Sequence, residues 1–282
     1  MREYNKIYLN EVGLACSLGI GKQAISDALF TPTLSFEKEA HNQARETLVS
    51  GRRVVVKRVP GLLEAITSPI EKMDTRTNRI LKLTLDEIKT TVENAKAIYR
   101  PDRIGIILST STSGMQEGQD AFIHYQQTGR WPDSYCYRQQ ELHSPTDFTA
   151  QYLGINGPAY TISTACSSSG KALCSAARLL KANICDAVIV GGVDSLCDLT
   201  LNGFDSLELI AQDLCSPFSQ NRQGINIGEG AAVFVMSRHP SAIEYAGGGE
   251  SSDAYHISSP APNGEGAEAA IKAALDQANL SI

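Results

Sequence analysis

The chain has 282 residues, 42% of them hydrophobic and 20% charged, with a formal net charge of −6; this is a globular composition that predicts no broad basic surface for nucleic acid. The sequence has no run of about 18 apolar residues and no apolar leader segment at its N-terminus, so neither a membrane span nor a signal peptide is expected. Its seven cysteines include no C-x-x-C pair, which favours a reducing cytoplasm over a disulfide framework or a zinc site.

Strand-like and helix-like segments alternate along the chain, which favours a layered α/β fold. The uninterrupted apolar runs at 104–108 and 186–190 are typical of strands buried on both faces of a sheet. Residues 31–75 are expected to be irregular except for one extended run. In chain order, the pattern predicts a strand at 7–9, a helix at 22–29, an extended run at 53–59, a helix at 76–99, a strand at 104–108, helices at 114–127 and 145–152, a strand at 160–163, a helix at 166–182, strands at 186–190, 231–236 and 243–246, and a helix at 266–278.

One cysteine stands where a predicted strand runs directly into a predicted helix. Cys166 follows the strand at 160–163 and opens a helical pattern rich in small residues. A cysteine in the first turn of a helix lies at the positive end of the helix dipole, which favours the thiolate over the thiol. This arrangement is typical of a nucleophile elbow. Cys174, two turns further along, has no such placement and is interpreted as a core residue.

The order of strand, glycine-rich turn and helix near the N-terminus returns near the C-terminus. Residues 243–249 supply the second strand and its glycines, and 266–278 supply the second helix. We therefore expect two parts, a first half over 1–240 and the beginning of a second half over 241–282.

Several sequence motifs, taken together and in this order, carry a specific resemblance. They are Arg103-Ile-Gly-Ile-Ile, Gly157-Pro-Ala-Tyr-Thr-Ile-Ser-Thr-Ala-Cys-Ser-Ser-Ser, Asp186-Ala-Val-Ile-Val-Gly-Gly-Val-Asp, Pro217-Phe-Ser-Gln-Asn-Arg-Gln-Gly-Ile-Asn-Ile-Gly-Glu-Gly-Ala and Ser251-Ser-Asp-Ala-Tyr-His. They resemble the motifs of the β-ketoacyl synthases, condensing enzymes of the thiolase superfamily. The resemblance implies the layered αβαβα fold of that family, with the first half complete and only the start of the second half present.

The resemblance also implies a reaction, a decarboxylative Claisen condensation. Cys166 would take an acyl group as a thioester from an acyl carrier protein, which delivers it on phosphopantetheine. Malonyl carrier protein would then lose carbon dioxide, and its carbanion would attack the thioester to give a 3-oxoacyl chain for fatty-acid, polyketide or polyene synthesis. The chain shows no motif for a bound cofactor and no histidine pair with metal-ligand spacing.

Four further residues match positions near the active centre of the family. Phe204 matches an aromatic residue that lines the acyl pocket, and a plain core position is an equal alternative. Thr112 matches a position that gates this pocket from the dimer interface, and a simple loop residue is the alternative. Asp253 and His256 match residues close to the centre, where His256 is interpreted as a hydrogen-bonded residue of the pocket wall rather than a general base.

The chain departs from the family in lacking the two histidine motifs and the lysine that the second half supplies. None of its five histidines replaces them, so the chain alone is expected not to complete the condensation. An apolar face meant for the second half is expected to need a cover. The resemblance implies a homodimer, or a heterodimer with another synthase subunit, formed partly through the strand that leads into Cys166.

Two other functions remain open. The first is a non-condensing partner subunit of the chain-length-factor kind, and Cys166 argues against it because such subunits usually replace the nucleophile. The second is a thiolase or another cysteine acyltransferase that uses coenzyme A. The Gly-Glu-Gly and Ser-Ser-Asp-Ala-Tyr-His motifs fit this second alternative less well than they fit a ketoacyl synthase.

Overall fold

The large sheet is the centre of the fold. The computed structural model of the chain describes residues 6–31, 43–257 and 259–281. In it, the sheet has seven strands, of which six follow the order β10-β1-β9-β7-β5-β6 and the seventh, β2, pairs with β1. Strands β5, β6 and β7 are parallel, with β6 at the edge of the sheet, whereas β9 is antiparallel to both β7 and β1. The strands are β1 (Tyr8–Cys16), β2 (Gly19–Ile20), β5 (Ile104–Ser109), β6 (Ala159–Ile162), β7 (Ala187–Asp194), β9 (Gly230–Ser237) and β10 (Ile243–Glu244).

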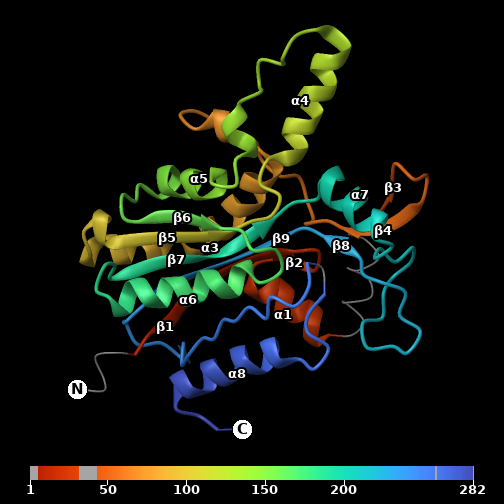
Figure 1. Ribbon diagram of the computed structural model, residues 1–282. Helices are drawn as coiled ribbons and strands as arrows, with labels where there is room; N and C mark the ends of the chain where they lie inside the picture. The colour runs from red at the N-terminus through yellow and green to blue at the C-terminus, as the bar shows by residue number, and fades with distance from the viewer. Residues whose placement is uncertain (1–5, 32–42, 258, 282) are drawn as a thin grey trace.

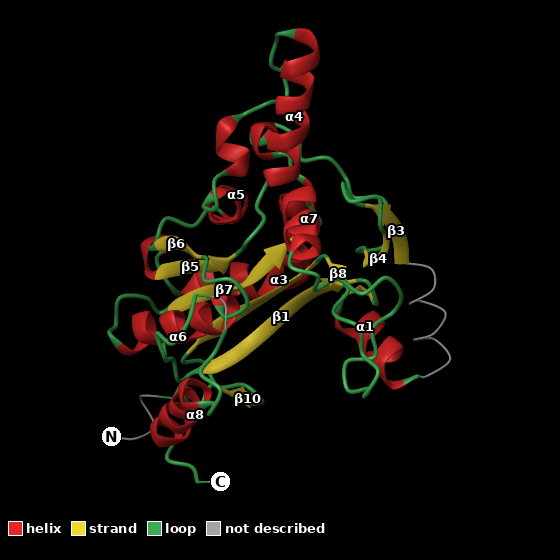
Figure 2. Ribbon diagram, turned by 45° about the vertical axis from the view of Figure 1, so that its right-hand side comes forward, coloured by secondary structure: helices red, strands yellow, loops and turns green. Residues whose placement is uncertain are grey.

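A small three-stranded sheet lies beside the large one (Figure 2). It consists of β3 (Gln43–Thr47), β4 (Arg53–Lys57) and β8 (Ile227–Gly228). The extended run expected at 53–59 is confirmed as β4, but the expectation of irregular structure is wrong for β3, which pairs antiparallel with β4. The side chains of β3 alternate between exposed and half-buried positions and are nearly all polar, so no apolar pattern marks this strand in the sequence.

Helices cover both faces of the large sheet and give the layers seen in Figure 1. On one face lie α3 and α5, on the other lies α6, and α4 projects away from the layers. Short 3-10 turns occur at Glu71–Met73, Pro101–Arg103 and Tyr137–Gln140. The helices are α1 (Lys22–Phe30), α3 (Arg76–Ile98), α4 (Met115–Thr128), α5 (Ser144–Leu153), α6 (Ser168–Lys181), α7 (Asp198–Ser206) and α8 (Glu265–Ala278).

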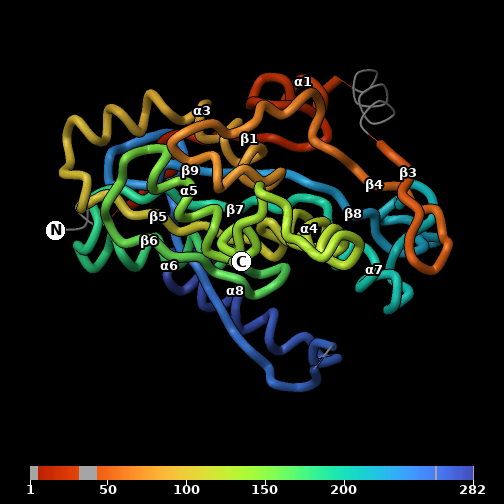
Figure 3. The backbone as a smooth tube through the Cα atoms, turned by 90° about the horizontal axis from the view of Figure 1, so that it is seen from above, coloured from red at the N-terminus to blue at the C-terminus, as the bar shows by residue number. Residues whose placement is uncertain are grey.

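A run of three glycines separates α6 from α8. A Cβ atom added to Gly248 would lie 2.5 Å from the sulfur of Cys174 on α6, and one added to Gly249 would lie 1.8 Å from the carbonyl oxygen of Ala270 on α8. The backbone at 247–249 is therefore packed between the two helices. The layer order is helix, sheet, helix, extended segment and helix, with α3 and α8 on opposite sides of the sheet (Figure 3). The division of the chain at residue 240 into a first half and the beginning of a second stays a prediction.

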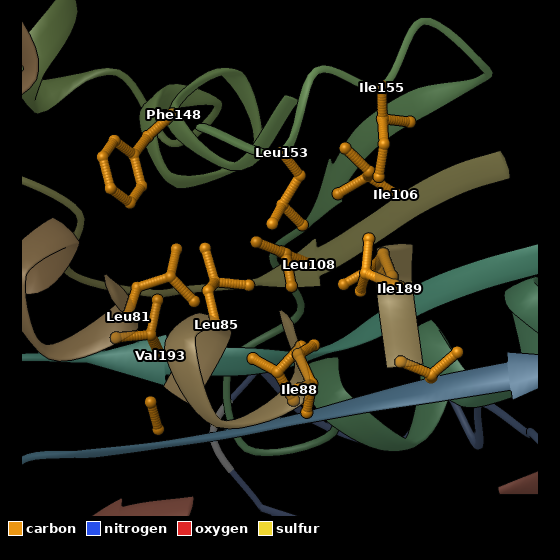
Figure 4. Close-up of a cluster of buried hydrophobic side chains, with 14 of the residues drawn as sticks. Leu81, Leu85, Ile88, Ile106, Leu108, Phe148, Leu153, Ile155, Ile189 and Val193 are labelled. Atoms are coloured by element: carbon orange, nitrogen blue, oxygen red, sulfur yellow. The ribbon is translucent and has the colours of Figure 1, made fainter. Parts of the chain in front are cut away.

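The longest helix, α3, is anchored by one apolar stripe. It begins after Thr75, whose hydroxyl accepts the backbone N–H of Asn78 at 3.1 Å. The stripe consists of the buried apolar side chains of α3. Full burial of each large one contributes about 1.5–3 kcal/mol, so together they hold α3 firmly on the sheet. Figure 4 shows part of this core, in which Leu81, Leu85 and Ile88 of α3 lie with Ile106, Leu108, Ile189 and Val193 of the strands and with Phe148 and Leu153 of α5.

The elements predicted from the sequence are confirmed for most of the large sheet, with shifted ends. All six residues of β5 are buried, as expected for a strand covered on both faces. The first strand is longer than predicted and runs to Cys16, because Asn10 and Glu11 interrupt the apolar pattern at a shift in the pairing register with β9. Helix α7 was not expected.

A buried carboxylate joins the two sheets to α3. The side chain of Glu229, between β8 and β9, is fully buried. Its carboxylate accepts the Nε–H of Arg76 at 2.7 Å, a second bond from the same guanidinium, and the backbone N–H of Val59 at 2.8 Å. Since a buried charge is tolerated only when it is paired and hydrogen-bonded, Glu229 fixes the start of α3 against the end of β4.

Replacing Glu229 by alanine should lower the free energy of unfolding by about 3 kcal/mol, because it leaves the Arg76 guanidinium and the Val59 N–H without their acceptor. Chemical denaturation measures the loss. The matched control is Glu46→Ala, since Glu46 pairs with Arg58 at a site where both side chains are over one-third exposed, and this change should cost about 0.5 kcal/mol or less. Equal losses in the two variants would contradict the role assigned to Glu229.

Candidate active site

A tight turn presents Cys166 between β6 and α6. Ala165 adopts a left-handed conformation, with φ of 53°, which is uncommon for a residue with a side chain. The hydroxyl of Ser168 closes the turn, since it accepts the backbone N–H of Thr164 at 2.7 Å and donates to the carbonyl of Ala165 at 2.6 Å. The side chain of Cys166 is exposed at the top of this turn, as a nucleophile elbow requires.

The predicted helix at 166–182 begins two residues later than expected. Its N-cap is Ser167, whose carbonyl accepts the N–H of Lys171 at 3.0 Å. The left-handed Ala165 forms the turn before the helix, and Cys166 and Ser167 lie between that residue and the first residue of α6. Cys166 consequently lies just outside the first turn of α6, close to the unpaired N–H groups at the positive end of the helix.

Two cavities meet at Cys166. The first, which we name the α7 cavity, has a volume of about 530 Å³ and extends from Cys166 to α7. One part of its wall is polar and the other part is apolar, so it can hold a molecule with a reactive polar end and an apolar body. Besides Cys166, the polar residues are Ser109, Ser111, Thr112, Ser168, Ser169, Asp194, Ser195 and Thr200, and the apolar ones are Ala165, Leu199, Phe204, Leu207 and Ile227.

Two of the residues singled out in the sequence lie in the wall of the α7 cavity. Phe204 is half-buried on α7 and packs against the apolar cluster under the small sheet. Thr112 is buried, and its hydroxyl donates to Asp194 at 3.0 Å and accepts the N–H of Ser195 at 3.1 Å. The structure therefore brings both residues to the cavity that contains Cys166. Their roles in acyl binding and gating stay predictions.

Asp194 is a residue of the site to which sequence reasoning gave no role. Its Oδ1 atom accepts bonds from the Thr110 hydroxyl at 3.0 Å, the Ser111 N–H at 2.7 Å, and the N–H and hydroxyl of Thr112 at 3.0 Å each. These bonds join the carboxyl ends of the neighbouring parallel strands β5 and β7, where ligands of α/β sheets commonly bind. The sequence contained a signal for this contact. An acidic residue ends one buried strand, and a Ser-Thr-Ser-Thr-Ser run ends the other.

The second cavity, which we name the glycine cavity, has a volume of about 510 Å³ and lies between α6 and residues 247–251. Cys174 is half-buried in its wall, so the interpretation of Cys174 as a core residue is wrong. In the same wall, Glu250 accepts bonds from Lys171 at 3.1 Å and Arg178 at 2.5 Å. The hydrogen bond from Arg178 is the main cause that holds the pKa of Glu250 below its ordinary value.

Asp253 and His256, the other two residues singled out in the sequence, line neither cavity. They lie together in a neighbouring hollow that shares Ser251 with the glycine cavity. The carboxylate of Asp253 accepts the backbone N–H groups of Ala261 at 2.9 Å and Tyr255 at 3.1 Å, and these bonds lower its pKa. A close approach of these two residues to Cys166 stays a prediction.

Two negative findings apply to the described part of the chain. No three residues among its His, Cys, Asp and Glu side chains gather into a possible metal site. Within residues 6–31, 43–257 and 259–281, no helix combines the length and the apolar character needed to cross a membrane.

The sequence matches the protein family described as "Beta-ketoacyl synthase, N-terminal domain" over residues 16–242. It is 30% identical over 196 residues to 3-oxoacyl-[acyl-carrier-protein] synthase 2 from Staphylococcus aureus, and the match covers 64% of this chain and 48% of that protein. It is 36% identical over 138 residues to Nodulation protein E from Rhizobium meliloti, and the match covers 46% of this chain and 34% of that protein. The chain thus matches less than half the length of these curated relatives.

Solved structures share the fold of the whole chain. A chain in the complex of the ketosynthase ApeO with its chain length factor ApeC from Xenorhabdus doucetiae aligns with a TM-score of 0.89 and 40% identity, covering 100% of this chain and 70% of that chain. A Beta-ketoacyl synthase from Burkholderia phymatum STM815 aligns with a TM-score of 0.77 at 20% identity, which shows the fold alone. The expected thiolase-like layered α/β fold is thereby confirmed.

The Glu250 site predicts a dependence of stability on pH. Because folding lowers the pKa of Glu250, the carboxylate stabilises the folded chain above its unfolded pKa, and this contribution is lost as the pH falls through the folded value. Glu250→Gln should therefore cost about 0.5–1 kcal/mol at pH 7, and the difference from the unsubstituted chain should vanish in acid. Urea denaturation at pH 7 and pH 3.5 measures it.

The control for this test is Glu244→Gln, which removes a partner of Lys6 in an exposed ion pair and should change stability little at either pH. A Glu250→Gln deficit that persists undiminished at pH 3.5 would show that the side chain acts through packing rather than through its charge.

Proposed function

The chain belongs to the β-ketoacyl synthase family, and on that premise we propose that it carries the acyl-accepting nucleophile of a 3-oxoacyl-[acyl-carrier-protein] synthase. The sulfur of Cys166 attacks the carbonyl carbon of an acyl thioester presented by an acyl carrier protein. A new carbon–sulfur bond forms at Cys166, the bond to the phosphopantetheine sulfur breaks, and the carrier leaves as its thiol. The acyl group is then held on the chain as a thioester.

The observation that carries this proposal is the position of Cys166 between the two cavities. The reaction needs room for an acyl chain on one side of the sulfur and an approach for a carrier-bound group on the other. The α7 cavity, with apolar residues at α7, suits the acyl chain. The glycine cavity, with polar and charged residues beside the same cysteine, offers the second approach.

The second step is the condensation itself. Malonyl carrier protein loses carbon dioxide, the resulting carbanion forms a carbon–carbon bond with the acyl carbonyl, and the sulfur of Cys166 leaves as the thiolate. The chain has no His-Gly-Thr or Gly-His motif, and no histidine lines either cavity in the described part of the chain. We propose that groups outside residues 1–282 supply the decarboxylation chemistry, and that this chain alone performs the acyl transfer.

A chain-length-factor role is the second candidate. The complex of the ketosynthase ApeO with its chain length factor ApeC, to which this chain is similar, supports pairing of two such subunits. The retained Cys166 favours the ketosynthase member for this chain, because a nucleophile at an elbow has no use in a subunit that only shapes a pocket.

The acyl transfer is tested by incubating the chain with octanoyl acyl carrier protein and mapping the label by mass spectrometry. One octanoyl group should appear on Cys166, and Cys166→Ala should remove it. Cys174→Ala is the matched control, since Cys174 lines the same glycine cavity, and it should keep the label. A label on Cys174, or none at all, would refute the proposal, while efficient labelling by octanoyl coenzyme A alone would favour the thiolase-like alternative.

Two exposed features support a second synthase subunit as partner. In the described chain, β6 ends the large sheet and has β5 as its one neighbouring strand. Three aromatic side chains, Phe122, Tyr125 and Trp131, are each 40–49% exposed on or beside the projecting helix α4. Open strand edges and exposed aromatic clusters are typical of interfaces.

If the partner is a second copy of this chain, the two copies form a dimer. Multi-angle light scattering at micromolar concentration should then give twice the chain mass of 30.4 kDa. Trp131→Ser should weaken the dimer at least tenfold, because it removes the ring stacked against Tyr125 at 4.8 Å and Tyr135 at 4.5 Å, and it should leave octanoyl labelling of Cys166 unchanged. A dimer equally stable in this variant would place the interface elsewhere.

A further inference from the structure

A cavity at the opposite end of the sheet from Cys166 has no part in the proposed function. It has a volume of about 370 Å³ and lies where α3 ends and β9 leaves the sheet. Ala187 lines it and begins β7, whereas Asp194, which lines the α7 cavity, ends the same strand. At 3.2–3.4 Å per residue the two sites are roughly 20 Å apart. We name it the α3 cavity.

The floor of the α3 cavity is apolar. Ala95 of α3, Ala187 of β7 and Val235 of β9 form it and are all buried, and Ile98 stands at the edge with 71% of its surface exposed. An apolar molecule on this floor would cover the exposed part of Ile98, and burial of apolar surface contributes about 25 cal/mol per Å².

Part of the rim is already fixed by its own hydrogen bonds. The hydroxyl of Ser237 donates to Oδ1 of Asn10 at 2.6 Å, and Nδ2 of Asn10 donates to the carbonyl of His239 at 2.6 Å. The hydroxyl of Ser241 donates to the carbonyl of Leu9 at 2.7 Å. These bonds hold the connection after β9 in place, so this wall of the cavity is formed before any ligand arrives.

The rim also offers polar side chains that form no hydrogen bond within the described part of the protein. Within the described residues, the side chains of Thr91, Asn94, Tyr99 and His239 line the cavity and form no hydrogen bond to another protein group. They present a hydroxyl, an amide, a phenol and an imidazole. No Asp, Glu, Lys or Arg lines the cavity, so an ionised ligand would lose hydration without gaining an opposite charge.

We propose that the α3 cavity is a binding site for a small neutral molecule with an apolar body and one or two hydrogen-bonding groups. The body lies on Ala187 and Val235, and the polar groups bond to Asn94 and His239. Such a ligand connects the end of α3 with the segment at 238–241, which leads from β9 to β10. The inference is independent of acyl transfer at Cys166.

The test compares three probes of similar shape, benzyl alcohol, benzoate and benzylammonium, by protein-observed NMR at neutral pH. Benzyl alcohol should shift the side-chain amide signals of Asn94 and the ring signals of His239 with saturation, and the two charged probes should bind at least tenfold more weakly. Ala95→Leu fills the floor and should reduce the affinity for benzyl alcohol at least tenfold.

The matched control is Ala97→Leu, which adds the same atoms to an exposed position of α3 outside the cavity and should leave the affinity unchanged. Asn94→Leu, at an exposed position of the rim, provides the same comparison if Ala95→Leu fails to fold. The proposal is overturned if benzyl alcohol does not bind, if the charged probes bind equally well, or if the cavity variants bind like the control. Each of these variants should leave the labelling of Cys166 unchanged. A failure of this proposal can therefore be distinguished from a failure of the acyl-transfer proposal.

Discussion

The carboxylate of Asp194 holds together the carboxyl ends of β5 and β7, and the cavity beside Cys166 depends on that junction. Four donors from residues 110–112 converge on one carboxylate oxygen. Hydrogen bonds to a charged acceptor are stronger than neutral ones, so a single side chain fixes the path of the loop after β5. Buried Thr77 supports the same junction from α3, since its hydroxyl lies 2.7 Å from that of Ser195.

Small residues set how deeply α6 sits on the sheet, and thereby where Cys166 stands. The hydroxyls of Ser109 and Ser169 are 2.8 Å apart, and a Cβ atom on Gly192 would lie 2.2 Å from the first and 2.8 Å from the second. Ala172 and Ala176 of α6 are fully buried on the same face. A larger side chain at Gly192 would push the helix outward and carry the cysteine away from the serine-lined wall.

The sequence was sufficient where a local pattern has one physical solution. Uninterrupted apolar runs identified β5 and β7, and the strand-to-helix junction identified Cys166 as the candidate nucleophile. The missed features depend on contacts between distant segments. Strand β3 is recognisable only by its pairing with β4, and Asp194 acquires its role only when β5 lies beside β7. The left-handed conformation of Ala165 could not be predicted either, because alanine gives no signal for that conformation in the sequence.

One sulfur atom serves both the α7 cavity and the glycine cavity, and this imposes an order in time. If Cys166 carries the acyl group, the first carrier protein has to depart before a second can approach the same atom, because both arrive by way of one exposed turn. Under the proposed function, acyl transfer and condensation would therefore take place one after the other at the same sulfur, which is the order of a ping-pong mechanism, with the decarboxylation chemistry supplied from outside this chain. The order of the two steps thus follows from the geometry, because the two cavities share the one residue Cys166.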